Sequence, residues 1–485
     1  MGNFSLQNYK VYYAKLVTKR QFYVNIIIYD FHKNNLLKRL IFMNERIGIV
    51  SLGCAKNQVD AEMMLFTLRQ AGYKIVADPA MADVVIVNTC GFIESAKQES
   101  IEEIIELGKL KEEGKIKSII VTGCLAERYQ HAVKEQLYEV DAVVGIGGNE
   151  DIAKVVEKSL QGEQTELYPS KLCLPLEGGR VQSTPSHYAY LKLGDGCDNR
   201  CTYCAIPLIR GKFRSRTMES LVAEAEQLVN NGVKELILIA QDVTRYGIDL
   251  YGELKLPQLL DQLCQIENLK WIRLLYCYPD EFTDELIDCM ARQDKILKYV
   301  DIPLQHCNNR VLKSMNRRGT KETIVNVITK LREKMPDIVL RTTFICGFPG
   351  ETEEEFNELA EFVQDIKFQR LGCFAYSQEE DTPAASFENQ IDDEIKERRA
   401  EIIMEQQMSI MEEYCQQLVG KQIEVVCEGY DRYAQCYFGR SMADSPDVDG
   451  KVFFKAEGEH KPVIGEFVTV EIEDYLDCDP IGVMT

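Results

Sequence analysis

Apolar segments of strand length alternate with helical segments from Arg46 onward, and this alternation constrains the fold more than any other feature of the 485-residue chain. Parallel strands need a long crossover between them, so a strand–helix repeat is typical of a parallel sheet covered by helices. The first run of repeats predicts an α/β domain built on a doubly wound parallel sheet. Its expected strands lie in RIGIVSLGC, DVVIVNTC, KSIIVTGC and DAVVGIGG.

A second run of the same repeat follows residues 161–186, which are rich in turn-forming residues and are expected to be a linker. Six strand segments separated by helical segments predict an open, partial (β/α)6 barrel, smaller than the closed eight-fold form. The segments lie at 188–193, 235–240, 271–276, 298–303, 338–345 and 370–376.

The two ends of the chain differ in character from these repeats. Residues 1–42 carry seven Lys or Arg against one acid, in apolar pieces broken by charge, and we interpret them as a basic N-terminal appendage. From residue 417, short strands separated by Asp, Gly and Pro turns predict a small antiparallel β-barrel. The expected domains are 43–165, 183–416 and 417–485, which agrees with roughly 150 residues per domain.

Charge and cysteine content narrow the class of protein. The chain has 77 acidic against 56 basic residues, a formal net charge of −21, which disfavours a protein that binds nucleic acid through its overall field. Because no apolar run approaches the roughly 20 residues of a membrane span, no membrane partner is expected. Seventeen cysteines without a cleavable signal peptide indicate metal ligands in a reducing, cytoplasmic location rather than a disulfide framework.

Cys197, Cys201 and Cys204 form a C-x3-C-x2-C motif directly after the first strand of the second run. Three thiolates at this spacing can hold three irons of a four-iron cluster and leave the fourth iron open for a substrate or cofactor. A structural zinc site normally closes with a fourth protein ligand, and no Cys or His follows nearby. A zinc site and unligated buried cysteines are the alternative interpretations.

A second set of cysteines, Cys54, Cys90 and Cys124, ends three successive strands of the first domain, in SLGC, VNTC and VTGC. The carboxyl ends of parallel strands lie at one edge of a sheet, where doubly wound folds bind ligands. We therefore expect the three thiols to lie together and to hold a second cluster with an open iron. For any one of them alone, an ordinary buried cysteine is the alternative.

The C-x3-C-x2-C motif, with Tyr203 before its last cysteine, resembles that of the radical S-adenosylmethionine (SAM) superfamily. Taken with the first-domain cysteines, the chain from Met43 to Thr485 resembles the methylthiotransferase family. This similarity implies a radical SAM barrel in the second domain and a TRAM domain at the C-terminus. It rests on SLGCAKNQVDAE (51–62), NTCGFIESAKQES (88–100), TGCLAERY (122–129), GCDNRCTYCAIPLIRGKFRSR (196–216), PLQHCNNRVLKSMNR (303–317), FICGFPGET (344–352) and FAYSQEEDTPA (374–384).

The resemblance also implies two [4Fe-4S] clusters, SAM as cofactor and a reductant protein as partner. In the family, the cluster held by the C-x3-C-x2-C motif cleaves SAM to a radical that removes a hydrogen atom from the substrate. The cluster of the first domain holds the sulfur that a second SAM methylates before its transfer. No catalytic residue beyond the cluster ligands is expected.

Residues at the strand ends of the second domain are expected to bind SAM. Two resemble the family's segment near the methionyl group, two follow the fourth strand, and two lie in a tight turn that an adenosyl group can approach. Capping of the following helix by a T-x-x-E sequence is the alternative explanation of that turn. The six residues are Gln241, Asp242, Asp301, Gln305, Gly347 and Gly350.

A basic loop follows the C-x3-C-x2-C motif. It carries Arg210, Lys212, Arg214 and Arg216. These side chains are expected either to contact the cofactor carboxylate or the substrate, or to form a solvated basic loop.

The charge of the C-terminal domain bears on the substrate. From Gln417 onward there are 14 acids against six bases, a net charge of −8, which would repel RNA and attract a basic protein. Glu379 and Glu380 stand where a tRNA-modifying member of the family would be expected to carry a basic residue. The resemblance implies one of two substrates, an adenosine of tRNA or an aspartate of ribosomal protein S12 of the small subunit, and the charge favours the second. We therefore expect transfer of a methylthio group to the β-carbon of that aspartate, in S12 free or on the ribosome.

In this interpretation Asp444, Asp447 and Asp449 face the basic partner, and tRNA is not a partner. A tRNA adenosine methylthiotransferase and a nonenzymatic iron–sulfur scaffold are the alternative functions.

Overall fold

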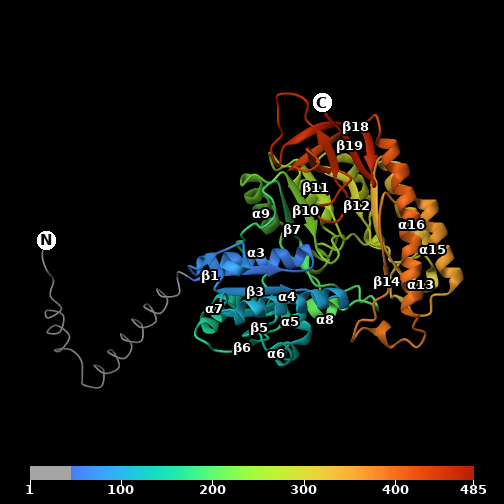
Figure 1. Cartoon of the computed structure of the whole chain (residues 1–485). Coiled ribbons are helices and arrows are strands. Elements are labelled where there is room, and N and C mark those ends of the chain that lie inside the picture. The colour runs from blue at the N-terminus through green and yellow to red at the C-terminus, as the bar shows by residue number, and fades with distance from the viewer. Residues whose placement is uncertain (1–44) are drawn as a thin grey trace, which may run out of the picture.

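The computed structural model describes residues 45–485, which form two parallel sheets and a closed β-barrel (Figure 1). The first sheet lies at one end of the molecule, the second in the middle, and the barrel at the opposite end (Figure 1). The appendage predicted for 1–42 lies outside the described residues. Among the described helices, none combines the length and apolarity needed to cross a membrane.

The first sheet has six parallel strands and helices on both faces, which confirms the doubly wound prediction. Helices α3 (Ala55–Gln70) and α7 (Ile152–Leu160) pack on one face. Helices α4 (Glu94–Glu112), α5 (Cys124–Tyr129) and α6 (His131–Gln136) pack on the other. Across the sheet the strands are β2 (Lys74–Ile75), β1 (Arg46–Ser51), β3 (Val84–Thr89), β4 (Ser118–Gly123), β5 (Ala142–Val144) and β6 (Thr165–Leu167).

The linker predicted for 161–186 is wrong in its first part, because β6 pairs with β5 as the last strand of the sheet. The strand has three residues, Thr-Glu-Leu, and its apolar content is too low to predict it. The rest of the segment packs on α3, where the backbone N–H of Ser183 donates to Glu62 Oε1 at 2.7 Å.

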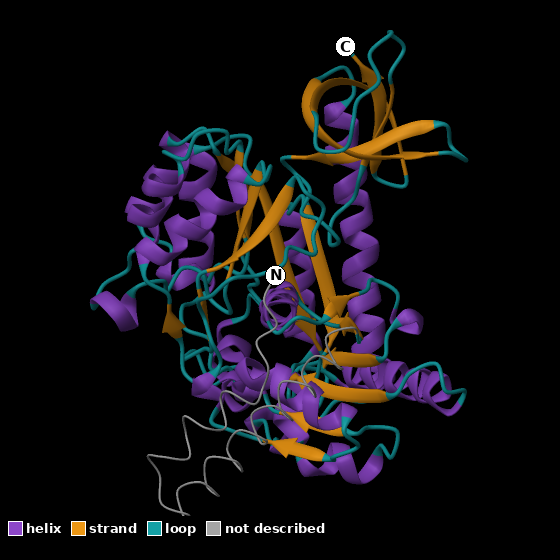
Figure 2. Cartoon of the chain, turned by 90° about the vertical axis from the view of Figure 1, so that its left-hand side faces the viewer, coloured by secondary structure: helices purple, strands orange, loops and turns teal. Residues whose placement is uncertain are grey.

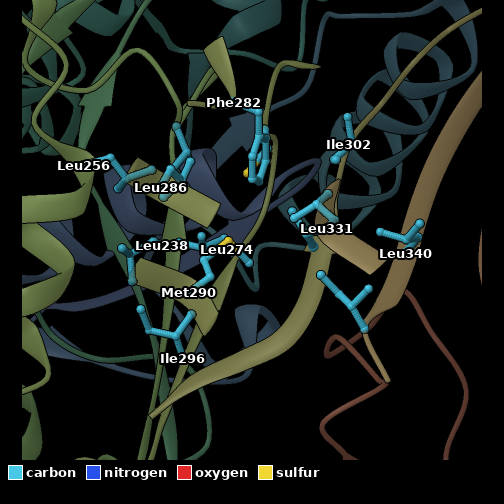
Figure 3. Packing of buried hydrophobic residues seen from close by; sticks show 14 of the residues in the cluster. Leu238, Leu256, Leu274, Phe282, Leu286, Met290, Ile296, Ile302, Leu331 and Leu340 are labelled. Atoms are coloured by element: carbon cyan, nitrogen blue, oxygen red, sulfur yellow. The ribbon is translucent and has the colours of Figure 1, made fainter. Parts of the chain in front are cut away.

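The second sheet has six parallel strands that follow one another in chain order. The two outer strands pair with one neighbour each, so the described sheet does not close, and the predicted partial barrel is confirmed. On its outer face Leu238, Leu274 and Ile296 pack against Leu286 and Met290 of a covering helix (Figure 3). The strands are β7 (Tyr188–Lys192), β10 (Glu235–Ile239), β11 (Trp271–Leu274), β12 (Ile296–Asp301), β13 (Val339–Cys346) and β14 (Arg370–Ala375).

Helices cover the outer face of this sheet. The longest, α16 (Asp393–Leu418), packs along β14 and leads to the C-terminal barrel (Figure 2). The other helices of the second domain are α9 (Met218–Asn230), α10 (Ile248–Tyr251), α11 (Leu256–Leu263), α12 (Asp284–Arg292), α13 (Asn309–Ser314), α14 (Lys321–Lys334) and α15 (Glu353–Ile366). Helix α8 (Ile206–Arg210) packs instead on α5 of the first domain, and it lies between two short strands that pair antiparallel, β8 (Gly194–Asp195) and β9 (Arg214–Ser215).

The C-terminal barrel closes from five strands, as expected for a small β-barrel. Four of its strand pairs are antiparallel, but β17 and β19 pair in parallel, so the fully antiparallel prediction is wrong at this closure. In order around the barrel the strands are β15 (Gln422–Asp431), β16 (Cys436–Ser441), β17 (Val452–Lys455), β19 (Asp479–Met484) and β18 (Phe467–Leu476).

The loop between β16 and β17, residues 442–451, packs against the second sheet. Asp444, 2% exposed, forms an ion pair of 2.5 Å with Arg370 at the start of β14. Asp449 accepts a 2.7 Å hydrogen bond from the Tyr299 hydroxyl. The expectation that Asp444 and Asp449 face a partner is therefore wrong: net charge counts these acids but does not show that they are buried inside the protein. Asp447 is exposed.

Candidate metal centres

Cys54, Cys90 and Cys124, called the first triad below, lie at the carboxyl ends of β1, β3 and β4. Cys54 is the N-cap residue of α3 and Cys124 is the first residue of α5. From β1 the chain proceeds to β2 on one side and then to β3 on the other. The triad therefore flanks the switch point of the sheet, where doubly wound folds bind ligands.

Glycines beside these cysteines let the three strand ends approach one another. A Cβ at Gly53 would lie 2.8 Å from the Cβ of Cys90. A Cβ at Gly91 would lie 2.7 Å from the backbone of Leu125, the residue after Cys124. Any larger residue at either position would push the triad apart, so the sequence brings the thiols together through backbone contact.

The electrostatic environment differs among the three thiols. Burial acts to raise the pKa of Cys54, but the charges of Lys56 and Arg210, with backbone N–H groups at the start of α3, outweigh it and lower that pKa. Burial raises the pKa of Cys90, and it raises that of Cys124 to about 12 although Arg210 opposes it.

Arg210 of α8 joins the second domain to the first triad. Its guanidinium donates to Asp60 Oδ2 at 2.8 Å, to Asp195 Oδ2 at 2.7 Å and to Asn57 Oδ1 at 3.0 Å. It also contacts Cys124 Sγ at 3.7 Å. The side chain is buried, so four partners from both domains fix one cation beside the thiols.

The basic loop therefore does not form a solvated surface at Arg210, and the same holds for Arg216. Arg216 is buried and pairs with Glu224 at 2.6 Å. Arg214 donates to the carbonyl oxygen of Leu172 at 2.7 Å, whereas Lys212 is exposed. Of the four basic residues, only Lys212 is exposed, as a solvated basic loop would require.

Cys197, Cys201 and Cys204, called the second triad, lie in the loop between β8 and α8. The Cys197 N–H donates to the Gly211 carbonyl at 3.1 Å, and the Cys204 N–H donates to the Cys201 carbonyl at 3.1 Å. These bonds fold the loop back on itself, so that three thiols separated by short spacers share one loop. Burial raises the pKa of Cys197 to about 11.

One aromatic side chain, Tyr278, and one basic side chain, Arg317, flank the second triad. The Tyr278 hydroxyl lies 4.0 Å from Cys201 Sγ. The Arg317 guanidinium lies 3.8 Å from the centroid of the Tyr278 ring. A buried cation thus lies close to the second triad as well.

The residues expected to bind SAM divide into two groups. Gln241 and Asp242 lie beside the second triad: Asn199 of the cysteine loop donates to Asp242 Oδ2 at 2.8 Å, and Gln241 donates to Asp195 Oδ1 at 3.2 Å. The Oε1 atom of Gln241 is buried without a hydrogen-bond partner among the described residues.

The other four residues are engaged within the protein. Asp301 accepts from Arg341 at 2.8 Å and from the Tyr276 N–H at 2.9 Å. Gln305 has a positive φ of 72° and bridges to β13. At Gly347, a Cβ would lie 2.1 Å from Lys396 Cγ, so the helix α16 makes the close approach there. Gly350 donates to the Asn389 carbonyl at 2.7 Å.

The T-x-x-E sequence after this turn does cap a helix. The Thr352 hydroxyl accepts from the Glu355 N–H, and the Glu355 carboxylate accepts from the Thr352 N–H, at the start of α15. Capping therefore explains the residues after Gly350, while packing of Lys396 explains Gly347.

The donor set of both triads fits iron–sulfur clusters better than a single ion. All six thiols are free of disulfides, and no three His, Cys, Asp or Glu of residues 45–485 converge on one metal position. In a four-iron cluster each thiolate binds a different iron, so the ligands surround the cluster without converging on a point. Arg210 beside Cys124 supplies a charge-assisted donor of the kind that supports such thiolates.

Three family models match the chain. They are the radical SAM superfamily over residues 191–363, the uncharacterized protein family UPF0004 over 46–145, and the TRAM domain over 419–484. A ribosomal protein uS12 methylthiotransferase RimO from Desulforamulus reducens is 51% identical over 440 residues, which cover 90% of this chain and 98% of the relative. The chain belongs to the RimO family of methylthiotransferases.

Other similarities agree with membership in the RimO family. A protein of the same description from Clostridioides difficile is 48% identical, with the same coverage of both chains. The solved structure of TsrM, a radical SAM methyltransferase from Kitasatospora setae, has a TM-score of 0.52 at 15% identity and covers 68% of this chain and 72% of its own, which shows a shared fold. The RimO family chain is therefore an enzyme, and its radical SAM match implies SAM and a [4Fe-4S] cluster.

Several residues of this region were missed by sequence reasoning. Asp60 and Asp195 hold Arg210, and Lys192 pairs with both of them. Lys192 carried a signal, because a lysine at the end of the apolar strand YAYLK must find a buried partner. Asp60 carried none, since its partner lies 150 positions away.

Proposed function

We propose that this enzyme adds a methylthio group to the β-carbon of an aspartate in ribosomal protein uS12. The observation that carries the proposal is the 51% identity to a uS12 methylthiotransferase along nearly the whole of both chains. The net charge of −21 suits a basic ribosomal protein, because complementary charge speeds encounter. From a ribosomal substrate we infer a cytoplasmic location, and from radical SAM chemistry we infer a reductant protein as a second partner.

The second triad, Cys197, Cys201 and Cys204, would hold the cluster that binds SAM, and the first triad would hold an auxiliary cluster. When bound, these groups supply radical cleavage of SAM and a sulfur for transfer. Gln241 and Asp242 lie where they can contact SAM, since both touch the cysteine loop or its anchors. The proposed SAM site also includes residues at the ends of β12 and β13, namely Asp301, Gln305, Gly347 and Gly350.

The chain's own residues hold the two triads in a fixed position relative to each other. Arg210 belongs to the helix that follows the second triad, yet it contacts Cys124 and two residues of α3. Lys192 and Asp195 complete a buried network that excludes water between the domains. Exclusion of water matters because a carbon radical formed there would otherwise react elsewhere.

Mass spectrometry of uS12 and of tRNA from a deletion strain tests the proposal. Loss of a methylthio mass from uS12, restored by the intact gene, is the expected result. Loss from tRNA with uS12 unaltered would contradict it and would assign the tRNA adenosine activity instead.

A further inference from the structure

Buried cations in the described part of the chain are almost all paired with carboxylates. Lys192, for example, bonds Asp60 and Asp195, and Arg273 bonds Glu235 at 2.8 Å. Two buried cations form no ion pair with any described carboxylate: Lys56, next to the first triad, and Arg317, next to the second. The paired ones are Lys97, Lys192, Arg210, Arg216, Arg273, Arg370, Lys396, Arg399 and Arg440.

Lys56 lies where the first domain meets the carboxyl end of the second sheet. It follows Cys54 by two residues, and its side chain is 6% exposed. Its Nζ lies 3.2 Å from the centroid of the Tyr276 ring, which follows β11. The ammonium is thus placed between the first triad and the interior of the partial barrel.

Tyr276 is itself held in place. It has a positive φ of 60°, an uncommon conformation for an aromatic residue. Its N–H donates to Asp301, and Asp301 is bound by Arg341. The ring that supports Lys56 therefore has a defined position, and so does the ammonium above it.

We propose that Lys56 binds the side-chain carboxylate of the substrate aspartate. This inference rests on the proposed function and adds the residue that selects the substrate. A buried ammonium without a carboxylate to pair with is costly, and an incoming carboxylate reduces that cost. The β-carbon of aspartate is bonded directly to the carboxylate carbon, so an anchored carboxylate also fixes the carbon that reacts. An adenosine offers no carboxylate to this position.

The competing role for Lys56 is compensation of the negative thiolates of the first triad. Arg210 already contacts Cys124 through a fixed guanidinium. The charge of Lys56 lowers the pKa of Cys54, but no hydrogen bond joins Lys56 Nζ to a thiol among the described residues. The Nζ atom instead lies over the face of Tyr276, in the other domain. This geometry favours a cation presented to a ligand over one bound to the cluster thiolates.

The test compares binding of two labelled peptides from the target loop of uS12, one with the native aspartate and one with asparagine in its place. The enzyme carries both clusters and SAM, and affinity is measured by fluorescence anisotropy. The wild type should bind the aspartate peptide roughly 10- to 100-fold more tightly, as expected for a hydrogen-bonded charge. Equal affinity of the wild type for both peptides overturns the inference without any variant.

Lys56→Met should remove most of this preference, by weakening the aspartate peptide and leaving the asparagine peptide nearly unchanged. Lys56→Arg should restore part of it. Lys74→Met, an exposed lysine on β2 of the same domain, is the matched control and should keep the full preference.

The midpoint potential of the auxiliary cluster, followed by electron paramagnetic resonance, separates the two roles of Lys56. A shifted potential with an intact preference for aspartate assigns Lys56 to charge compensation and overturns the inference. The proposed function fails separately, if the wild type leaves intact uS12 unmodified while cleaving SAM.

Discussion

The two ends of the second sheet are both lined by buried charges, but they differ in how completely the charges are paired. At the amino end, Glu235 bonds both Arg273 and Arg440, and the β16–β17 loop adds a further ion pair through Asp444. At the carboxyl end, Lys56 and Arg317 form no ion pair with a described carboxylate. Complete pairing marks a structural junction between domains, whereas unpaired cations beside free thiols mark the end where chemistry takes place.

Cys201→Ala should have the largest effect, because it removes a thiol from the end where SAM is expected to bind. Reconstituted anaerobically, the variant should retain about half of the roughly eight irons of two four-iron clusters and lose cleavage of SAM. Iron content and 5′-deoxyadenosine formation are the measurements. Cys436→Ala, a half-buried cysteine of the C-terminal barrel, is the matched control. Full iron and normal cleavage in the Cys201 variant would refute the assignment of the second triad.

Cys90→Ala should separate the two functions expected at the carboxyl end of the second sheet, which are cleavage of SAM and transfer of the methylthio group. The variant should still form 5′-deoxyadenosine, since the second triad is intact, but should give no methylthiolated uS12. Product mass spectrometry checks this expectation. A methylthiolated product from this variant would contradict the auxiliary role assigned to the first triad.

Glu235→Gln should weaken the amino end without affecting SAM cleavage. The substitution leaves Arg273 buried without a carboxylate and leaves Arg440 with Glu428 alone, at a cost of about 3 to 5 kcal/mol in the free energy of unfolding. Trp271, the single tryptophan of the chain, reports on this junction because its ring lies 4.7 Å from Phe467 of the C-terminal barrel. Urea unfolding followed by its fluorescence is the measurement.

The control for Glu235→Gln is Glu424→Gln, which breaks an exposed ion pair of 2.6 Å with Lys270 across the same junction. Exposed pairs contribute at most about 1 kcal/mol, so this variant should unfold nearly as the wild type does. Equal destabilisation by both variants would show that burial of the charges is not what stabilises the junction.

Lowering the pH should destabilise the protein through the same carboxylate, Glu235, with a smaller effect than the substitution. Burial opposes ionisation of Glu235, but Arg440 and Arg273 lower its pKa to about 2, below the usual 4.5. Its contribution to stability is therefore complete above about pH 4.5 and is lost as the pH falls toward 2. The difference in unfolding free energy between wild type and Glu235→Gln, measured through Trp271, should shrink over this range. A constant difference would mean that Glu235 is not the titrating group.

The strands of both parallel sheets were predictable because apolar runs of strand length alternate with helices, and buried parallel strands leave that pattern in the sequence. The first triad was predictable for the same reason, since three cysteines occupy equivalent strand ends. β6 and the parallel pairing of β17 with β19 were not, because a three-residue strand and a barrel closure depend on neighbours distant in sequence.

Buried charge was the main failure of sequence reasoning. Asp444 and Asp449 were counted as a surface field, yet they bind Arg370 and Tyr299 inside the protein. Arg210 was assigned either to the cofactor or to solvent, whereas it bonds Asp60 of another domain. Composition records the sign of a charge, and only the tertiary structure decides whether a partner cancels it.

The position of Arg210 also couples the assembly of the two metal centres. The residue lies six positions after Cys204 and contacts Cys124 in the other domain. Any ordering of the second cysteine loop on metal loading therefore favours the arrangement of the first, and by thermodynamic reciprocity the first favours the second to the same extent. We expect loading of iron into the two centres to be cooperative, with half-loaded molecules less abundant than independent sites would produce.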